Sequence, residues 1–201
     1  MKDDSRRVRM TKMLLHKGLI EALREKSLDK VTVTEICDYA DVNRSTYYTY
    51  FNDPFDQLIQ YEQNIGEDIR EQLMVVLKDK DNNKQAKCYA LFQTALKYLY
   101  DIRDDFEVLV SGKLDLSIIK GILNDFWEPV FPMASGSLDS LDITERYRFL
   151  YAATGCFMMI SNWFTDENTV TADEMARMLT KFSMNCYGYE YSEEFFNTQT
   201  K

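Results

Sequence analysis

The sequence has few of the residues that break or cross-link a polypeptide chain. Its 201 residues include seven glycines, three prolines and four cysteines, and the cysteines form no CxxC pair. So few chain breakers favour long helices over a sandwich of short strands and turns. With one histidine, His16, and no clustered thiols, we expect no zinc site or other metal centre, and we interpret the cysteines as reduced core thiols.

Long apolar runs and enzyme motifs are missing as well. The uncharged stretch at 149–164 is shorter than the roughly 20 apolar residues that a membrane-spanning helix needs. The N-terminal segment MKDDSRRVRM lacks the apolar stretch of a signal peptide. The sequence contains no G-x-G-x-x-G, no P-loop and no G-x-S-x-G. We therefore expect a cytoplasmic protein that is not an enzyme and binds no cofactor.

The negative charge of the chain is concentrated outside its first fifty residues. The net charge is −9, yet residues 1–51 hold ten Lys and Arg against eight Asp and Glu, a balance of +2. A local basic face is what phosphate binding requires, and whole-chain charge is a poor guide to it. Three arginines near the start, Arg6, Arg7 and Arg9, fit two interpretations: a solvated terminus and an arm that contacts DNA.

The first fifty residues carry the pattern of three helices. Apolar residues at helical spacing predict the first helix over about 6–26. Its expected core face consists of Met10, Met13, Leu14, Gly18, Leu19, Ala22 and Leu23. Thr32, followed three residues later by Glu35, is a capping box, so a second helix starts there.

Two short helices joined by a tight turn, and backed by an amphipathic helix, make a helix-turn-helix arrangement. The turn falls at 40–43, and Asn43 is an N-cap for the second short helix, 44–50. In such proteins this helix enters the major groove of DNA with its N-terminal residues against base edges. The segment 43–51, NRSTYYTYF, suits that task because it has one cation, several hydroxyls and no carboxylate. The alternative is that its aromatic residues form a packing cluster without DNA chemistry.

At several fixed spacings, residues 9–58 resemble the N-terminal domain of TetR/AcrR-type transcriptional regulators. The matching residues are Val31-Thr32-Val33-x-x-Ile36, Ala40-x-Val42 and Ser45-Thr46-x-Tyr48-x-Tyr50-Phe51. The resemblance implies that phosphates are touched by Thr32 and Tyr48, and that the groove is faced by Thr34, Arg44, Ser45, Thr46 and Tyr50. It also implies a small three-helix core of Val33, Ile36, Ala40, Val42, Tyr47 and Phe51.

Two residues depart from the pattern of this family. Asp41 stands in the turn where glycine is usual, a modest cost because aspartate tolerates the left-handed conformation. Pro54 stands at the start of the fourth helix where lysine is usual. Losing that cation removes a phosphate contact, although the backbone amides at the helix N-terminus offer a substitute.

The rest of the chain has the pattern of a helical bundle. Helices are predicted at about 54–77, 84–101, 103–111, 115–131, 142–165 and 171–188, with loops at 79–84 and 132–140 and a loosely packed tail after Tyr189. In the family that the first part resembles, this bundle dimerises and holds a small-molecule cavity. Residues 155–179 are similar to its last two helices. The helix at 142–165 is apolar on nearly every face, so it needs a second cover, and a partner subunit is the simplest one.

We expect a homodimer through the helices at 142–165 and 171–188, bound to a palindromic duplex DNA operator. The bundle is expected to hold a small apolar or aromatic effector. Candidate ligand-binding residues are Tyr89, Phe92, Leu96, Phe106, Trp127, Phe131, Met158, Met159 and Trp163. For each of these, an ordinary place in the core is the competing interpretation.

The sequence therefore predicts an all-α protein of about nine helices. A helix-turn-helix DNA-binding domain is expected at 1–53, a helical ligand-binding and dimerisation domain at 54–190, and a tail at 191–201. The predicted function is that of a ligand-responsive transcriptional regulator acting as a repressor. The alternative is a regulator-like co-activator or interaction protein with weak or no DNA binding, which the absent lysine and the small basic charge favour.

Overall fold

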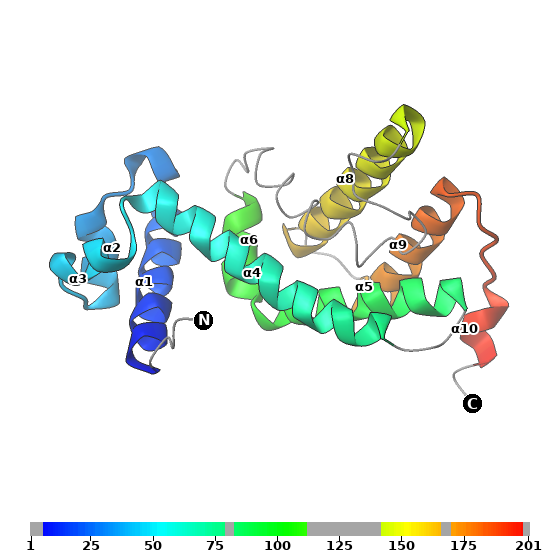
Figure 1. The fold of residues 1–201 in the computed structure, drawn as a ribbon, viewed down its shortest axis with the longest axis horizontal. Helices are drawn as coiled ribbons and strands as arrows, with labels where there is room; N and C mark the ends of the chain where they lie inside the picture. Colours follow the sequence, from blue (N-terminus) through cyan, green and yellow to red (C-terminus); the bar gives the residue numbers. More distant parts are fainter. Residues whose placement is uncertain (1–5, 79–82, 112–141, 166–169, 199–201) are drawn as a thin grey trace.

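Nine α-helices and one short 3-10 helix build the described part of the molecule, and no strand occurs within it. The computed structural model describes residues 6–78, 83–111, 142–165 and 170–198. A small head, formed by α1 to α3, lies at one end of a larger bundle, and the long helix α4 leads from one to the other (Figure 1). The predicted all-α class is confirmed. No helix in these ranges is long and apolar enough to cross a membrane.

The head consists of α1 (Arg6–Glu25), a 3-10 turn (Leu28–Lys30), α2 (Val33–Ala40) and α3 (Arg44–Tyr50). Both predicted caps are present. Thr32 and Glu35 form the capping box of α2, and the Asn43 side chain accepts a hydrogen bond from the Ser45 backbone amide at 2.9 Å. Between the two helices, Asp41 adopts the left-handed conformation that a tight turn needs, with φ 51° and ψ 46°.

Helices α1 and α2 approach each other closely at Gly18. A Cβ atom at this position would lie 2.4 Å from the Ile36 carbonyl oxygen and 3.2 Å from the Ala40 Cβ atom. Only glycine leaves room for this approach. Tyr47 and Phe51, which are 0% and 2% exposed, complete the core of the head as expected.

The expected core face of α1 is partly wrong. Met10, Met13 and Leu14 are 47%, 44% and 38% exposed, whereas Leu15 and His16 are buried. The apolar stripe of α1 is wide, and its spacing alone does not show which edge of the stripe is covered. The covered edge depends on α4 and α6, which pack against α1 together with α2.

The bundle contains α4 (Pro54–Leu77), α5 (Lys84–Asp101), α6 (Arg103–Ser111), α8 (Ile143–Thr165), α9 (Ala172–Cys186) and α10 (Glu194–Thr198). All but the last match helices predicted from the sequence. The predicted helix at 115–131 and loop at 132–140 lie outside the described residues, as does most of the loop at 79–84. Helix α4 is fastened to the head by Gln57, which is fully buried and donates its amide to the Leu15 carbonyl oxygen at 2.7 Å.

The C-terminal segment is docked on the bundle, which corrects the expectation of a loosely packed tail. Phe196 of α10 is 3% exposed and joins an apolar cluster with Tyr89 and other residues of α5 and α9. Gln85 of α5 exchanges two hydrogen bonds with the backbone of Ser192, at 2.8 and 3.0 Å. Contacts of this kind join residues far apart in the chain, so helical periodicity carries no signal for them.

Two titratable side chains are buried near the contact between α1 and α4. One belongs to α1 and the other to α4. His16 of α1 is 7% exposed, stacks on Tyr61 of α4, and has no hydrogen-bond partner for either ring nitrogen in the described structure. Burial, with a smaller contribution from the charge of Lys12, lowers the pKa of His16 to about 4. Glu62 of α4 is also 7% exposed, and burial raises its pKa to about 7. Burial thus disfavours the charged form of each group.

The substitution His16→Phe should remove an acid-dependent loss of stability. Because burial holds the pKa of folded His16 below its ordinary value of 6.5, the unfolded chain binds the proton first, so stability is lost as pH falls from 6.5 towards 4. Relative to the variant, the free energy of unfolding of the wild type should drop by about 3 kcal/mol from pH near 7 to pH near 4. Urea unfolding at both pH values measures this, and a pH-independent difference would contradict a neutral buried His16.

Candidate nucleic-acid interface

The residues expected to face DNA gather on the surface of α2 and α3. Those that are exposed to solvent are Thr34, Arg44, Ser45 and Tyr48, while Thr46 and Tyr50 are partly buried. The two helices that carry them contact each other and pack on the same core. Among the described residues, Arg44 forms no ion pair. Its guanidinium is therefore available to an outside partner.

Neighbouring tyrosines of α3 have opposite environments. Tyr47 is fully buried in the core, whereas Tyr48 is 54% exposed and packs edge-on against Tyr47, with 5.5 Å between ring centres. This contact holds the Tyr48 ring against the core while about half of the residue stays exposed to solvent. A phenol so placed is a suitable donor to a phosphate, and α3 contains no acidic residue that would repel one.

Lys12 of α1 adds a cation that the sequence reasoning did not single out. Its ammonium lies 5.9 Å from the centre of the Tyr50 ring, beside the last turn of α3. Tyr50 itself packs partly against the core of the head. Apolar periodicity assigns the core face of α1 but says nothing about which of its exposed cations approaches α3. No signal in the sequence therefore places Lys12 at this surface.

The hydroxyl of Thr32 is already engaged in the cap of α2. It donates to the Glu35 carboxylate at 2.8 Å and accepts from the Glu35 backbone amide at 3.3 Å. Glu35 also pairs with Lys26, and this hydrogen bond, together with those from Thr32, lowers the pKa of Glu35 to about 2. Thr32 thus anchors the start of α2, and its proton is not available to a phosphate while the cap is intact.

Carboxylates occupy the N-terminus of α4, which corrects the expectation that its amides replace the missing lysine. Asp53 accepts the Asp56 amide at 2.8 Å, and Asp56 accepts the Asn52 amide at 2.8 Å. Pro54 has no amide hydrogen to offer. Hydrogen bonds from Asn52 and Gln60 lower the pKa of Asp56, so its carboxyl is ionised at neutral pH. Two acidic side chains therefore stand where a cation was expected, and they repel phosphate.

The described candidates for ligand binding divide between two apolar clusters. The cluster between α5, α9 and α10 contains Tyr89, Phe92 and Leu96, with Met159 and Trp163 at its edge. Phe106 belongs to the other cluster and packs edge-on against Phe164, with 5.0 Å between ring centres. Met158 is 47% exposed, and Trp127 and Phe131 lie outside the described residues. No group of three or more His, Cys, Asp or Glu in the described ranges is arranged to hold a metal ion.

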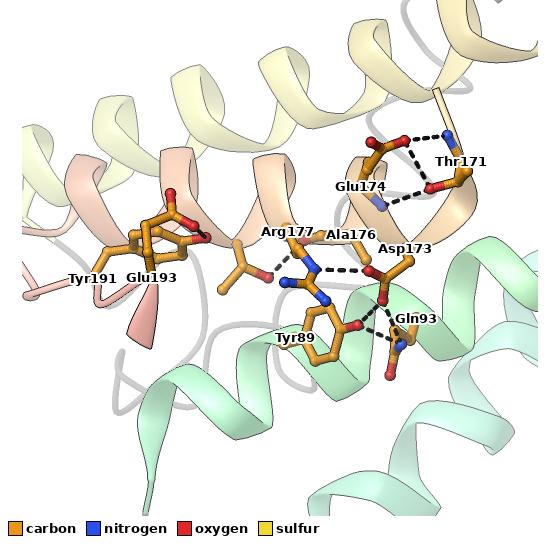
Figure 2. Close-up of polar contacts among 10 residues, drawn as sticks. Tyr89, Gln93, Thr171, Asp173, Glu174, Ala176, Arg177, Tyr191 and Glu193 are labelled. Carbon is orange, nitrogen blue, oxygen red and sulfur yellow. Dashed lines mark hydrogen bonds and ion pairs between the residues drawn. The ribbon is translucent and has the colours of Figure 1, made fainter. Parts of the chain in front are cut away.

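Tyr89 is held in a polar network that joins α5 to α9 (Figure 2). Its hydroxyl donates to Asp173, which also accepts a hydrogen bond from Arg177 at 2.7 Å. Gln93 donates to the Tyr89 hydroxyl at 2.7 Å. Beside this network, Gln93 and Asp173 line an open groove of about 540 Å³, to which Leu96 also contributes. Tyr89 therefore ties two helices together, and Leu96 is the described ligand candidate that borders the groove.

Solved structures of transcriptional regulators share this fold. One is a TetR transcriptional regulator from Streptococcus agalactiae 2603V, with a TM-score of 0.63 and 16% identity over 89% of this chain and 96% of that chain. The fatty acid degradation regulator FadR from Bacillus halodurans has a TM-score of 0.64 and 16% identity over 90% and 97%. A TetR-family transcriptional regulator from Streptomyces coelicolor has a TM-score of 0.63 and 12% identity over 96% and 95%. No protein-family model and no curated protein matches the sequence.

These likenesses establish the fold of the chain. It is the architecture of TetR-type regulators, a helix-turn-helix head on a helical bundle, and the match covers nearly the full length of each regulator. The fold that the resemblance of residues 9–58 implies is confirmed. The structural match also extends it to the bundle, where the sequence signal is weaker.

The substitution Pro54→Lys should strengthen binding to duplex DNA. It adds a cation beside Asp53 and Asp56 and restores a backbone amide at the start of α4. We expect a gain of about 3- to 10-fold at low salt, which shrinks as the salt concentration rises. Fluorescence anisotropy with a labelled duplex measures this. Pro54→Ala is the matched control because it removes the ring without adding charge, and equal affinities of the two variants would contradict a position of this turn near phosphates.

Proposed function

We propose that the protein is a ligand-responsive transcriptional regulator that acts as a repressor and reads duplex DNA with α3. The observation that carries this proposal is the solvent-facing surface of α3, where Arg44, Ser45 and Tyr48 are exposed and no side chain is acidic. Arginine pairs with guanine edges in the major groove, and hydroxyls donate to or accept from several bases. Thr34, Thr46 and Tyr50 are the further groove-facing residues of the proposal.

An exposed apolar stripe on α8 supports a homodimer. Ile143, Tyr147, Tyr151 and Met158 are 67%, 65%, 77% and 47% exposed. Their spacing of four, four and seven residues places them on one side of the helix. Phe182 of α9 is 51% exposed as well. Because large apolar side chains in a contiguous patch are typical of protein interfaces, we infer that α8 and α9 pair with their copies in a second subunit.

Two small residues of α8, Ala152 and Ala153, pack inside their own subunit rather than on the exposed stripe. Ala152 and Ala153 are 7% and 5% exposed within their own subunit, and Gly155 has no neighbour within 4 Å of an added Cβ atom. The proposed interface is therefore built from large side chains. Two-fold symmetry would present two copies of α3 to successive major grooves, about 34 Å apart, so the proposed target is a palindrome.

The proposed effector is a small apolar or aromatic molecule bound in the bundle. Its support is the groove of about 540 Å³ between α5 and α9, which Leu96 and Ala172 border. Such a molecule would lower DNA affinity if it bound better to a dimer with wrongly spaced heads. The loss of affinity would equal the difference in its binding free energy between the two states.

A second candidate function is that of a regulator-like interaction protein with weak DNA binding. The pair Asp53 and Asp56 at the start of α4 favours it, since both repel the phosphates that this turn would approach. A salt titration of duplex binding separates the two functions. A DNA reader loses affinity steeply with salt, in proportion to its phosphate contacts. Absence of binding to the DNA upstream of its own coding sequence at low salt would rule out the first proposal.

The substitutions Tyr48→Phe and Arg44→Ala should have different effects on DNA recognition. Tyr48→Phe removes a proposed phosphate donor, so it should weaken binding to all duplexes about equally. Arg44→Ala removes a proposed base contact, so it should cost about 1–3 kcal/mol on the operator and relax sequence preference at one position. Affinities for an operator and a scrambled duplex measure both effects. Loss of specificity in both variants would contradict the assignment of phosphate and base roles.

The substitution Tyr151→Glu should disrupt the dimer. Tyr151 is 77% exposed in the subunit, so the change costs little in the fold but puts two like charges into the proposed two-fold interface. We expect a shift from dimer to monomer in sedimentation velocity at micromolar concentration. Val75→Glu, at a residue of α4 that is 69% exposed, is the matched control and should remain dimeric. Dimers in both variants would place the interface elsewhere.

A further inference from the structure

Tyr61 of α4 contacts both the head and the bundle. Its ring stacks on His16 of α1, with 4.5 Å between ring centres and 20° between the planes. Its hydroxyl donates to the carboxylate of Asp105 on α6. One side chain therefore connects α1, α4 and α6.

The contact with the head is fixed by ring packing. The His16 ring also lies against Phe51 at the end of α3, with 5.4 Å between ring centres. Neither ring nitrogen of His16 has a hydrogen-bond partner in the described structure. The position of His16 thus depends on the two aromatic rings beside it, and one of these belongs to Tyr61.

The contact with α6 is polar and is reinforced one residue away. A phenol that donates to a carboxylate makes a charge-assisted hydrogen bond, which is stronger than a neutral one. Arg24 of α1 donates to the Asp104 carbonyl oxygen at 3.1 Å, so the first turn of α6 is tied to α1 as well as to α4. α6 in turn packs against α8, the helix of the exposed apolar stripe.

We propose that Tyr61 is a positioning residue for DNA binding, which fixes the orientation of the head relative to the bundle without touching DNA. The inference rests on the proposed function for its effect on affinity. A dimer grips two successive grooves only when both heads hold one orientation. Loosening the contacts of Tyr61 with α1 and α6 lowers the fraction of dimers whose heads are oriented to bind DNA, and the apparent affinity falls in proportion to that fraction.

Tyr61→Phe tests the proposal because it keeps the stacking ring and removes only the hydroxyl. Tyr98→Phe is the matched control: Tyr98 of α5 donates to Asp68 of α4 at 3.1 Å, so it loses a tyrosine–aspartate bond that does not involve the head. Tyr61→Phe should weaken binding to the upstream duplex about 5- to 10-fold, while Tyr98→Phe stays within about twofold. Thermal unfolding midpoints of the two variants should be similar, so a difference in affinity reports orientation rather than stability.

Hydrogen exchange on the free protein provides a readout that does not depend on DNA. Tyr61→Phe should speed exchange of amides in α1 and in the first turn of α6, and Tyr98→Phe should not. Equal losses of affinity in both variants, or unchanged exchange in α1 and α6 of Tyr61→Phe, would overturn the proposal. If the wild type binds no duplex, the proposed function fails by itself. The exchange pattern then still decides whether Tyr61 orients the head.

Discussion

The approach of α1 to α2 at Gly18 is the constraint on which the proposed DNA-facing surface depends. Because no side chain stands between the helices, the Ile36 carbonyl and Ala40 lie directly against α1. The contact reaches Ala40, the last residue of α2, directly before the left-handed turn at Asp41. The cap at Asn43 then starts α3, whose Tyr47 turns into the same core. The exposed surface of α3 consists of the side chains that this core does not use.

Helix starts were predictable because their chemistry is local. The capping box at Thr32 and the N-cap at Asn43 each involve residues within one turn, and both begin helices in the structure. The errors concern contacts between distant segments. Helical spacing does not show which edge of the α1 stripe α4 and α6 will cover. It also gives no sign that Phe196 docks against Tyr89 across the bundle.

The candidate site divides in the same way. Helical period and the cap at Asn43 suffice to predict which side chains of α3 reach solvent. The charge beside them on Lys12 comes from another helix, α1, and its position follows only from tertiary packing. The surface thus combines several groups suited to base edges with few suited to phosphates. We expect such a surface to discriminate among sequences better than it holds DNA in general.

Burial lowers the pKa of His16 and raises the pKa of Glu62 in the folded chain. The ordinary pKa values of the two groups are 6.5 and 4.5. As pH falls through this range, the buried imidazole lowers the stability of the folded state because only the unfolded chain binds its proton readily. Over the same range the buried carboxyl takes up a proton more readily than it does in the unfolded chain, which makes acid favourable. The two contributions offset each other. These two groups therefore compensate for each other, and together they change the stability of the chain less over this pH range than either group alone would.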